Sequence, residues 1–173
     1  MTKNKKIILT ALLLAATIVL GRLLSIRTPI ITIGFSFVPI IMCSVLLGWK
    51  YTLFVSTMSD LVGALIFPTG PYFFGFTISS LLTGLIYGIF LYRKSFNLNK
   101  KFLIKLFIVI VIETIFVNGI LNTIWVIITV KNAANIVILI RIIKQLIMIP
   151  VKYLTMLGLF KLYSGRINKL LND

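Results

Sequence analysis

Basic and polar side chains and one methionine recur along the last apolar stretch of the chain, three, four, seven and eleven residues after the first of them. They are Arg141, Lys144, Gln145, Met148 and Lys152. Because an α-helix completes a turn every 3.6 residues, one face carries them all. Cations beside an amide bind carboxylates well. Within a membrane such a face must line a polar cavity or reach a surface. We expect Arg141 and Lys144 to line a cavity and Lys152 to extend towards the cytoplasm.

Two acidic residues lie within apolar stretches, where ionisable groups are costly and are candidates for function. Asp60 lies seven residues before Phe67, about 10 Å along a helix from its expected outer end. Glu113 lies near the middle of its own stretch. In a dry site the Asp60 carboxylate can accept two parallel hydrogen bonds from ligand N–H groups. The alternative is that both acids pair with Arg22 or Lys144 and hold the helices together.

A third group combines amides with an aromatic ring. Asn118, Asn122 and Trp125 are spaced by four and seven residues and therefore share a helical face. A flat ring beside two amides suits a planar heteroaromatic ligand. Hydrogen bonds between helices would also explain the asparagines.

The stretch FPTGPYFFGFT, residues 67–77, predicts a stiff turn before a helix. Pro68 and Pro71 fix backbone angles, and Gly70 permits a positive φ. The aromatic side chains that project from this turn include Tyr72, Phe73 and Phe76. We expect a ligand mouth here, with an aromatic belt at the membrane interface as the alternative.

Small residues recur every fourth position in the helix that follows. The two resulting rows are Gly75–Ser79–Thr83 and Ser80–Gly84–Gly88. Rows of this kind allow helix backbones to approach closely.

The composition indicates what must position these groups. Of 173 residues, 60% are hydrophobic and 12% are charged. This predicts an all-α integral membrane protein, because a soluble domain carries more charge. At about 20 residues a span, six transmembrane helices fit, and we expect one transmembrane domain, 1–173. The predicted spans are 7–24, 33–47, 51–67, 73–92, 102–123 and 136–163, and continuation of the fifth through IWVIITV is left open.

Several classes are not expected. The chain has no histidine and one cysteine, so we expect no metal site and no cofactor. The formal charge is +15, but it lies in short breaks between apolar stretches, which does not favour nucleic-acid binding. Two acids in different spans do not assemble a catalytic set, so we do not expect an enzyme.

The distribution of lysine and arginine predicts the orientation in the membrane. One side would carry Lys3, Lys5, Lys6, Lys50, Arg93, Lys94, Lys100, Lys101, Lys105, Lys161, Arg166 and Lys169. The other side would carry Arg22, Arg27 and Lys131. Both termini are therefore expected in the cytoplasm, with the loops 25–32, 68–72 and 129–135 facing outward.

These stretches resemble the substrate-binding S component of energy-coupling factor (ECF) vitamin transporters, most closely the folate-specific kind. The resemblance rests on ALLLA, SIRTPIITIGFSFVPI, LVGALIFPTGPYFFGFTISSLLTGLIYG and RIIKQLIMIPVKY, and it covers nearly the whole chain. It implies an S-component-like bundle in the bacterial plasma membrane that binds a vitamin from outside. It also implies a transmembrane coupling protein and two ATP-binding-cassette ATPases as partners, which would hydrolyse ATP.

The resemblance assigns Ala11 and Ala15, the ends of ALLLA, to docking on the coupling protein. Arg22 follows Ala11 by eleven residues, about 20° around a regular helix, so we expect it to share that docking face and to point away from the ligand. Only a loosening of the helix at Gly21 would change this. Arg27, in the following loop, is then the better ligand candidate.

The leading hypothesis is a folate-binding uptake subunit, because folate combines a planar pterin with an anionic glutamate tail. The residues expected to bind it are Arg27, Asp60, Pro68, Tyr72, Phe73, Phe76, Asn122, Trp125, Arg141, Lys144 and Gln145. The alternatives are an S component for riboflavin or thiamin, or a solitary membrane carrier. Thiamin is a cation, which so basic a site would repel.

Overall fold

The structure is a computed structural model, and it describes residues 2–27, 32–68, 72–92, 98–129 and 134–172. Its helices are α1 (Lys3–Ile18), α2 (Phe37–Leu47), α3 (Trp49–Ile66), α4 (Phe74–Leu91), α5 (Lys100–Ile112), α6 (Asn122–Thr129) and α7 (Ala134–Asn172). Two π-helical segments, η1 (Val19–Leu23) and η2 (Glu113–Leu121), continue α1 and join α5 to α6. The strands β1 (Ile26–Arg27) and β2 (Thr32–Ile33) pair antiparallel, with Ile26 opposite Ile33.

The helices lie close to the stretches predicted as spans, and the main differences are at their ends. The fifth helix runs unbroken from Lys100 to Thr129, so it does continue through the described part of IWVIITV. The second helix begins at Phe37 instead of residue 33, because Thr32 and Ile33 pair with β1. Helix α7, which corresponds to the sixth predicted span, extends to Asn172, beyond the predicted end at 163.

Four helical stretches of the described chain are long and apolar enough to cross a membrane. They are Lys3–Leu23, Phe74–Leu91, Lys100–Thr129 and Ile138–Gly165. Helix α2 has 11 residues, about 17 Å at the helical rise, which is shorter than a hydrocarbon core of about 30 Å. Nine of its side chains are buried, from Phe37 to Leu47, so it forms the centre of the bundle.

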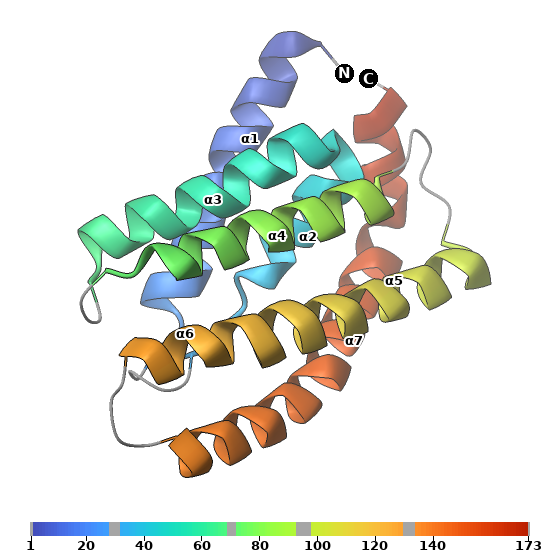
Figure 1. Ribbon diagram of the computed structural model, residues 1–173. Helices are drawn as coiled ribbons and strands as arrows, with labels where there is room; N and C mark the ends of the chain where they lie inside the picture. The colour runs from blue at the N-terminus through green and yellow to red at the C-terminus, as the bar shows by residue number, and fades with distance from the viewer. Residues whose placement is uncertain (1, 28–31, 69–71, 93–97, 130–133, 173) are drawn as a thin grey trace.

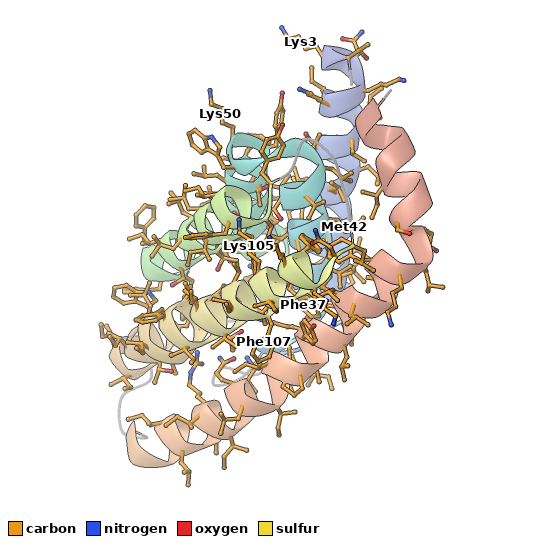
Figure 2. The ribbon with its side chains drawn as sticks, turned by 90° about the vertical axis from the view of Figure 1, so that its right-hand side faces the viewer. Lys3, Phe37, Met42, Lys50, Lys105 and Phe107 are labelled. Atoms are coloured by element: carbon orange, nitrogen blue, oxygen red, sulfur yellow. The ribbon has the colours of Figure 1, made fainter. Side chains whose placement is uncertain are left out.

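Helices α3 and α4 lie side by side, and the α5–α6 helix runs along the bundle between them and α7 (Figure 1). Helix α7 changes direction along its length, and Pro150 lies inside it (Figure 1). The start of α1 and the end of α7 lie at the same end of the molecule (Figure 1). Lys3 and Lys50 lie at that end too (Figure 2).

Small residues allow α3 and α4 to approach closely, as the row Ser80–Gly84–Gly88 predicts. A Cβ atom added to Gly84 would lie 2.8 Å from the Leu53 Cα and 3.0 Å from the Thr52 carbonyl oxygen. Both neighbours are backbone atoms, which cannot move aside. A Cβ at Gly88 would meet the backbone of Trp49 in the same way. These two glycines therefore set the distance between the helices.

The outer surface is largely apolar. Leu65, Phe116 and Leu146 are 78%, 60% and 64% exposed, and many other large hydrophobic side chains share this outer face. A surface of this kind is suited to lipid. Buried charges and hydroxyls lie instead on the inside of the bundle, where they surround a cavity.

Candidate binding site

A cavity of about 400 Å³ lies among α1, η1, α2, α3, α4, η2, α6 and α7. Of the eleven residues predicted to bind ligand, the cavity is lined by Asp60, Pro68, Tyr72, Phe73, Phe76, Asn122, Arg141, Lys144 and Gln145. They span 85 residues of the sequence, from Asp60 to Gln145, so the packing of several helices brings them together.

Of the other two predicted residues, only Trp125 has a described side chain, and it is not among those lining the cavity. Trp125 stands next to it: its ring lies 5.5 Å from the Phe73 ring between centroids, and its Nε1 donates to the Ser79 hydroxyl at 3.1 Å. Phe73 and Ser79 line the cavity themselves, so Trp125 supports its wall. Arg27 belongs to β1, but its side chain lies outside the described residues, as do Gly70 and Pro71.

Arg22 lines the cavity, so the prediction that it points away is wrong. The reason is η1, which widens the helical turn over Val19–Leu23. A π-turn contains about one residue more than an α-turn, and it rotates Arg22 out of the register set by Ala11. The guanidinium lies over Gly63, where an added Cβ would be 3.1 Å from its Cζ.

Arg22 and Asp60 form an ion pair, as the structural alternative for this acid proposes. The Arg22 Nη2 lies 3.2 Å from the Asp60 Oδ1 and donates to the Asp60 carbonyl oxygen at 3.2 Å. The Asp60 Oδ2 accepts from the Thr77 hydroxyl at 2.9 Å, and Thr77 is joined to the Tyr72 hydroxyl at 2.6 Å. A single polar chain therefore connects η1, α3 and α4 at this part of the cavity.

Glu113 is the centre of a second, deeper network. Its Oε2 accepts from the Lys152 Nζ at 2.7 Å and the Tyr87 hydroxyl at 2.8 Å. Its Oε1 accepts from the Asn118 Nδ2 at 2.5 Å. The pairing with a lysine agrees with a structural role, but the partner is neither Arg22 nor Lys144.

Lys152 is 5% exposed, so the prediction that it extends towards the cytoplasm is wrong. Its ammonium also donates to the Thr114 hydroxyl at 3.1 Å. A buried carboxylate and hydroxyl replace the water that a lysine at a surface would find. The helical spacing did place Lys152 correctly on the face it shares with Arg141 and Lys144.

Arg141 and Lys144, the other two cations on the cavity-lining face of α7, differ in their contacts. Arg141 is buried, and its Nε donates to the Thr123 hydroxyl at 2.9 Å while Nη2 lies 3.5 Å from the Asn118 carbonyl oxygen. Lys144 lines the cavity without an ion pair among the described residues. Lys144 is therefore the cation most available to an anion in the cavity.

Two buried amide atoms of the cavity wall lack a hydrogen-bond partner among the described residues. They are the Asn122 Oδ1, an acceptor, and the Gln145 Nε2, a donor. Gln145 is 6% exposed. Buried amide groups are rarely left unsatisfied, because each costs about 1–3 kcal/mol. These atoms can pair with a ligand that offers both a donor and an acceptor.

Among the described side chains that line the cavity, cations outnumber anions. Four are cations, Arg22, Arg141, Lys144 and Lys152, and two are anions, Asp60 and Glu113, a formal excess of two positive charges. The cavity also has the aromatic rings of Tyr72, Phe73 and Phe76 on its wall. It is chemically suited to an anion with a flat, hydrogen-bonding ring.

A helical bundle with an apolar outer surface and a charged inner cavity defines a membrane-embedded binding protein. The family model for the S component of ECF-type riboflavin transporters matches residues 1–164. The chain belongs to this family of ECF-type S components. It is a substrate-binding transport subunit of the cell membrane, in a family of non-enzymatic components that work with an ECF module.

Two proteins described as folate transporters are similar in sequence to most of this chain, and one solved structure is similar to it in fold. A folate transporter, FolT, of Clostridium novyi is 38% identical over 162 residues, covering 94% of this chain and 91% of that protein. A FolT of Leuconostoc mesenteroides is 27% identical over 86% of this chain and 80% of that one. A crystal structure of FolT bound with folic acid matches with a TM-score of 0.76 and 28% identity, covering 90% of each chain.

Proposed function

We propose that this S component binds folate with high affinity and delivers it to an ECF transporter for ATP-driven uptake. The observation that carries the proposal is the excess of two positive charges on the cavity wall. Folate brings two carboxylates, and burying them without cationic partners would be prohibitive. Riboflavin is uncharged and thiamin is a cation, so neither balances this cavity. The relatives named as folate transporters and the FolT structure with folic acid favour the same ligand.

Within the cavity we assign the glutamate tail to Lys144 and Arg141, with Gln145 beside them as a further hydrogen-bonding group. The pterin then lies against the aromatic side chains Tyr72, Phe73 and Phe76, near Asp60 and Asn122. Pro68 stiffens the adjoining turn, Trp125 supports the wall from behind Phe73, and Arg27 would reach the ligand from the β1–β2 hairpin.

The proposed topology has six transmembrane helices with both termini in the cytoplasm. The shared position of the α1 start and the α7 end favours termini on one side, and Lys3 and Lys50 at that end agree with the positive-inside rule (Figures 1 and 2). In this topology the whole chain, 1–173, is one transmembrane domain. The short helix α2 would cross only part of the bilayer within the bundle.

The proposed partners are a transmembrane coupling protein and two ATP-binding-cassette ATPases. We assign docking on the coupling protein to Ala11 and Ala15. Both are exposed on α1, and their small side chains allow another helix to approach closely.

Titration calorimetry of the purified protein with folate, riboflavin and thiamin tests the proposal. Folate is expected to bind without ATP and without partner proteins, and mass spectrometry should find it carried through purification. Heat with riboflavin or thiamin but none with folate would refute the assignment.

A further inference from the structure

We infer that Glu113 is a positioning residue for ligand specificity: through Asn118 it fixes the amide of Asn122 so that the cavity wall presents a hydrogen-bond acceptor to the ligand. The inference rests on the proposed function, because it specifies which edge of a folate-like ring this wall accepts. A ligand that fills the cavity must then present an N–H group to Asn122.

The three side chains form a continuous relay. The Asn118 Nδ2 donates to the Glu113 Oε1 at 2.5 Å, and the Asn122 Nδ2 donates to the Asn118 Oδ1 at 3.0 Å. The π-helical segment η2 makes this possible, because its wide turn brings residues five apart, such as Glu113 and Asn118, into line. All three residues line the cavity.

The direction of the relay follows from chemistry. An ionised carboxylate can only accept hydrogen bonds, so Asn118 must turn its NH₂ group towards Glu113 and its oxygen towards Asn122. Asn122 must in turn offer its own NH₂ group to that oxygen. Its Oδ1 is then left over, and it is the buried atom without a partner among the described residues.

The orientation of the Glu113 carboxylate is held from the other side. Its Oε2 accepts from the Lys152 ammonium at 2.7 Å and from the Tyr87 hydroxyl at 2.8 Å. An ammonium has no acceptor to offer, so this oxygen cannot be exchanged for an N–H group. Lys152 thus anchors one end of the relay, and the open acceptor on Asn122 is the other end.

The same cavity wall also offers the opposite kind of group. Gln145, on α7, has an unpartnered donor, Nε2, and is 6% exposed. A ligand that joins a heteroaromatic ring bearing N–H groups to a carboxylate tail can satisfy both: the ring donates to the Asn122 oxygen, and the tail accepts from the Gln145 Nε2. This is the chemical class that the wall selects.

A Glu113→Gln variant tests the relay, because it should reverse the donor-to-acceptor direction of each hydrogen bond in it. The oxygen of the substituted amide would remain with Lys152 and Tyr87, so the NH₂ group of that amide would face Asn118. Asn118 would then turn its oxygen to the substituted amide and its NH₂ group to Asn122. Asn122 would turn its oxygen to Asn118 and present NH₂ to the ligand, so that the wall becomes a donor.

The measurement compares folate with two analogues that each lack one hydrogen-bond donor of the pterin: the 2-deamino-2-methyl analogue, which lacks the exocyclic amino group, and the 3-methyl analogue, which lacks the ring N3–H. The readout is the ratio of each analogue's Kd to that of folate. For at least one analogue, the unmodified protein should give a ratio of about 10 to 100. In Glu113→Gln that ratio should fall by about tenfold or more. Steric effects of the methyl groups cancel, because the variant leaves the shape of the wall unchanged.

A second variant covers the case in which Glu113→Gln does not fold. Asn118→Leu interrupts the relay and frees the Asn122 amide to turn, so the ratio should move towards one. Thr57→Val is the matched control, because Thr57 carries the remaining unpartnered buried side-chain atom, Oγ1, of the described chain and does not line the cavity. The ratio should not change in Thr57→Val.

A Glu113 that serves only as counter-ion to Lys152 predicts another pattern. Both variants would then lower thermal stability and weaken folate and its analogues by the same factor, leaving every ratio unchanged. That result would overturn the inference while leaving the proposed function intact. If the unmodified protein binds no folate, the proposed function fails and the inference falls with it.

Discussion

Replacing Lys144 by methionine is expected to weaken folate strongly and a pterin without carboxylates only slightly. Methionine keeps most of the length of the side chain but removes the charge, so the formal excess on the cavity wall falls from two positive charges to one. Lys144 has no ion pair among the described residues, so the loss leaves no acid of the protein unpaired.

The expected magnitude follows from the charge pair that is lost. A lysine about 4 Å from a carboxylate contributes about 4 kcal/mol at an effective dielectric constant near 20. A hydrogen bond to a charged group contributes about 1.5–3 kcal/mol net. A loss of about 2–4 kcal/mol corresponds to roughly 30- to 800-fold in Kd.

The assay is calorimetric titration of folate and of 6-hydroxymethylpterin, with thermal unfolding of the same samples. Lys105→Met provides the matched control, because it removes the same charge from an exposed position outside the cavity. It should leave both affinities unchanged. If Lys144 only balances an acid of the protein, Lys144→Met will unfold at lower temperature and lose both ligands together, which would refute the reasoning.

Three further predictions concern other parts of the molecule. Asp60→Asn should weaken folate about tenfold or more, because it replaces one acceptor for the ligand N–H groups by a donor; an unchanged Kd in the same titration would leave Asp60 only its structural pairing with Arg22. Ala11→Trp or Ala15→Trp should abolish uptake by cells while folate binding persists, and equal loss of both would contradict a docking role. Gly84→Ala should lower stability by about 1–3 kcal/mol in thermal unfolding, since its Cβ would meet α3 backbone; an unchanged melting temperature would contradict that close approach.

Helical spacing alone predicted which side chains of the last helix share the face that lines the cavity. The stripe from Arg141 to Lys152 faces the cavity, because α7 keeps a regular turn along those residues. The row that includes Gly84 and Gly88 allows the close approach of another helix that was predicted, and the structure shows that this helix is α3. The resemblance to ECF-type S components, drawn from a few short stretches, is confirmed by the family comparison.

Where the helix departs from the regular turn, the prediction was wrong or incomplete. The position of Arg22 depends on η1, and only the neighbouring Gly21 hinted at that irregularity. The contact between Glu113 and Asn118 depends on η2, which has no proline or glycine at its start to announce it. Lys152 was misplaced for another reason: its partner Glu113 lies 39 residues away, and single-helix spacing does not reveal partners on other helices.

The unequal charges of the cavity have an electrical consequence. The described wall carries two more cations than anions, and folate carries two negative charges, so the loaded cavity is formally neutral. A rearrangement that moves the loaded cavity through the membrane field would do no work against the voltage. The empty cavity would return with two positive charges. Moving two charges across the whole membrane potential changes the free energy by about 4.6 kcal/mol per 100 mV. The membrane voltage would therefore act on the return of the empty subunit and not on the inward delivery of the vitamin.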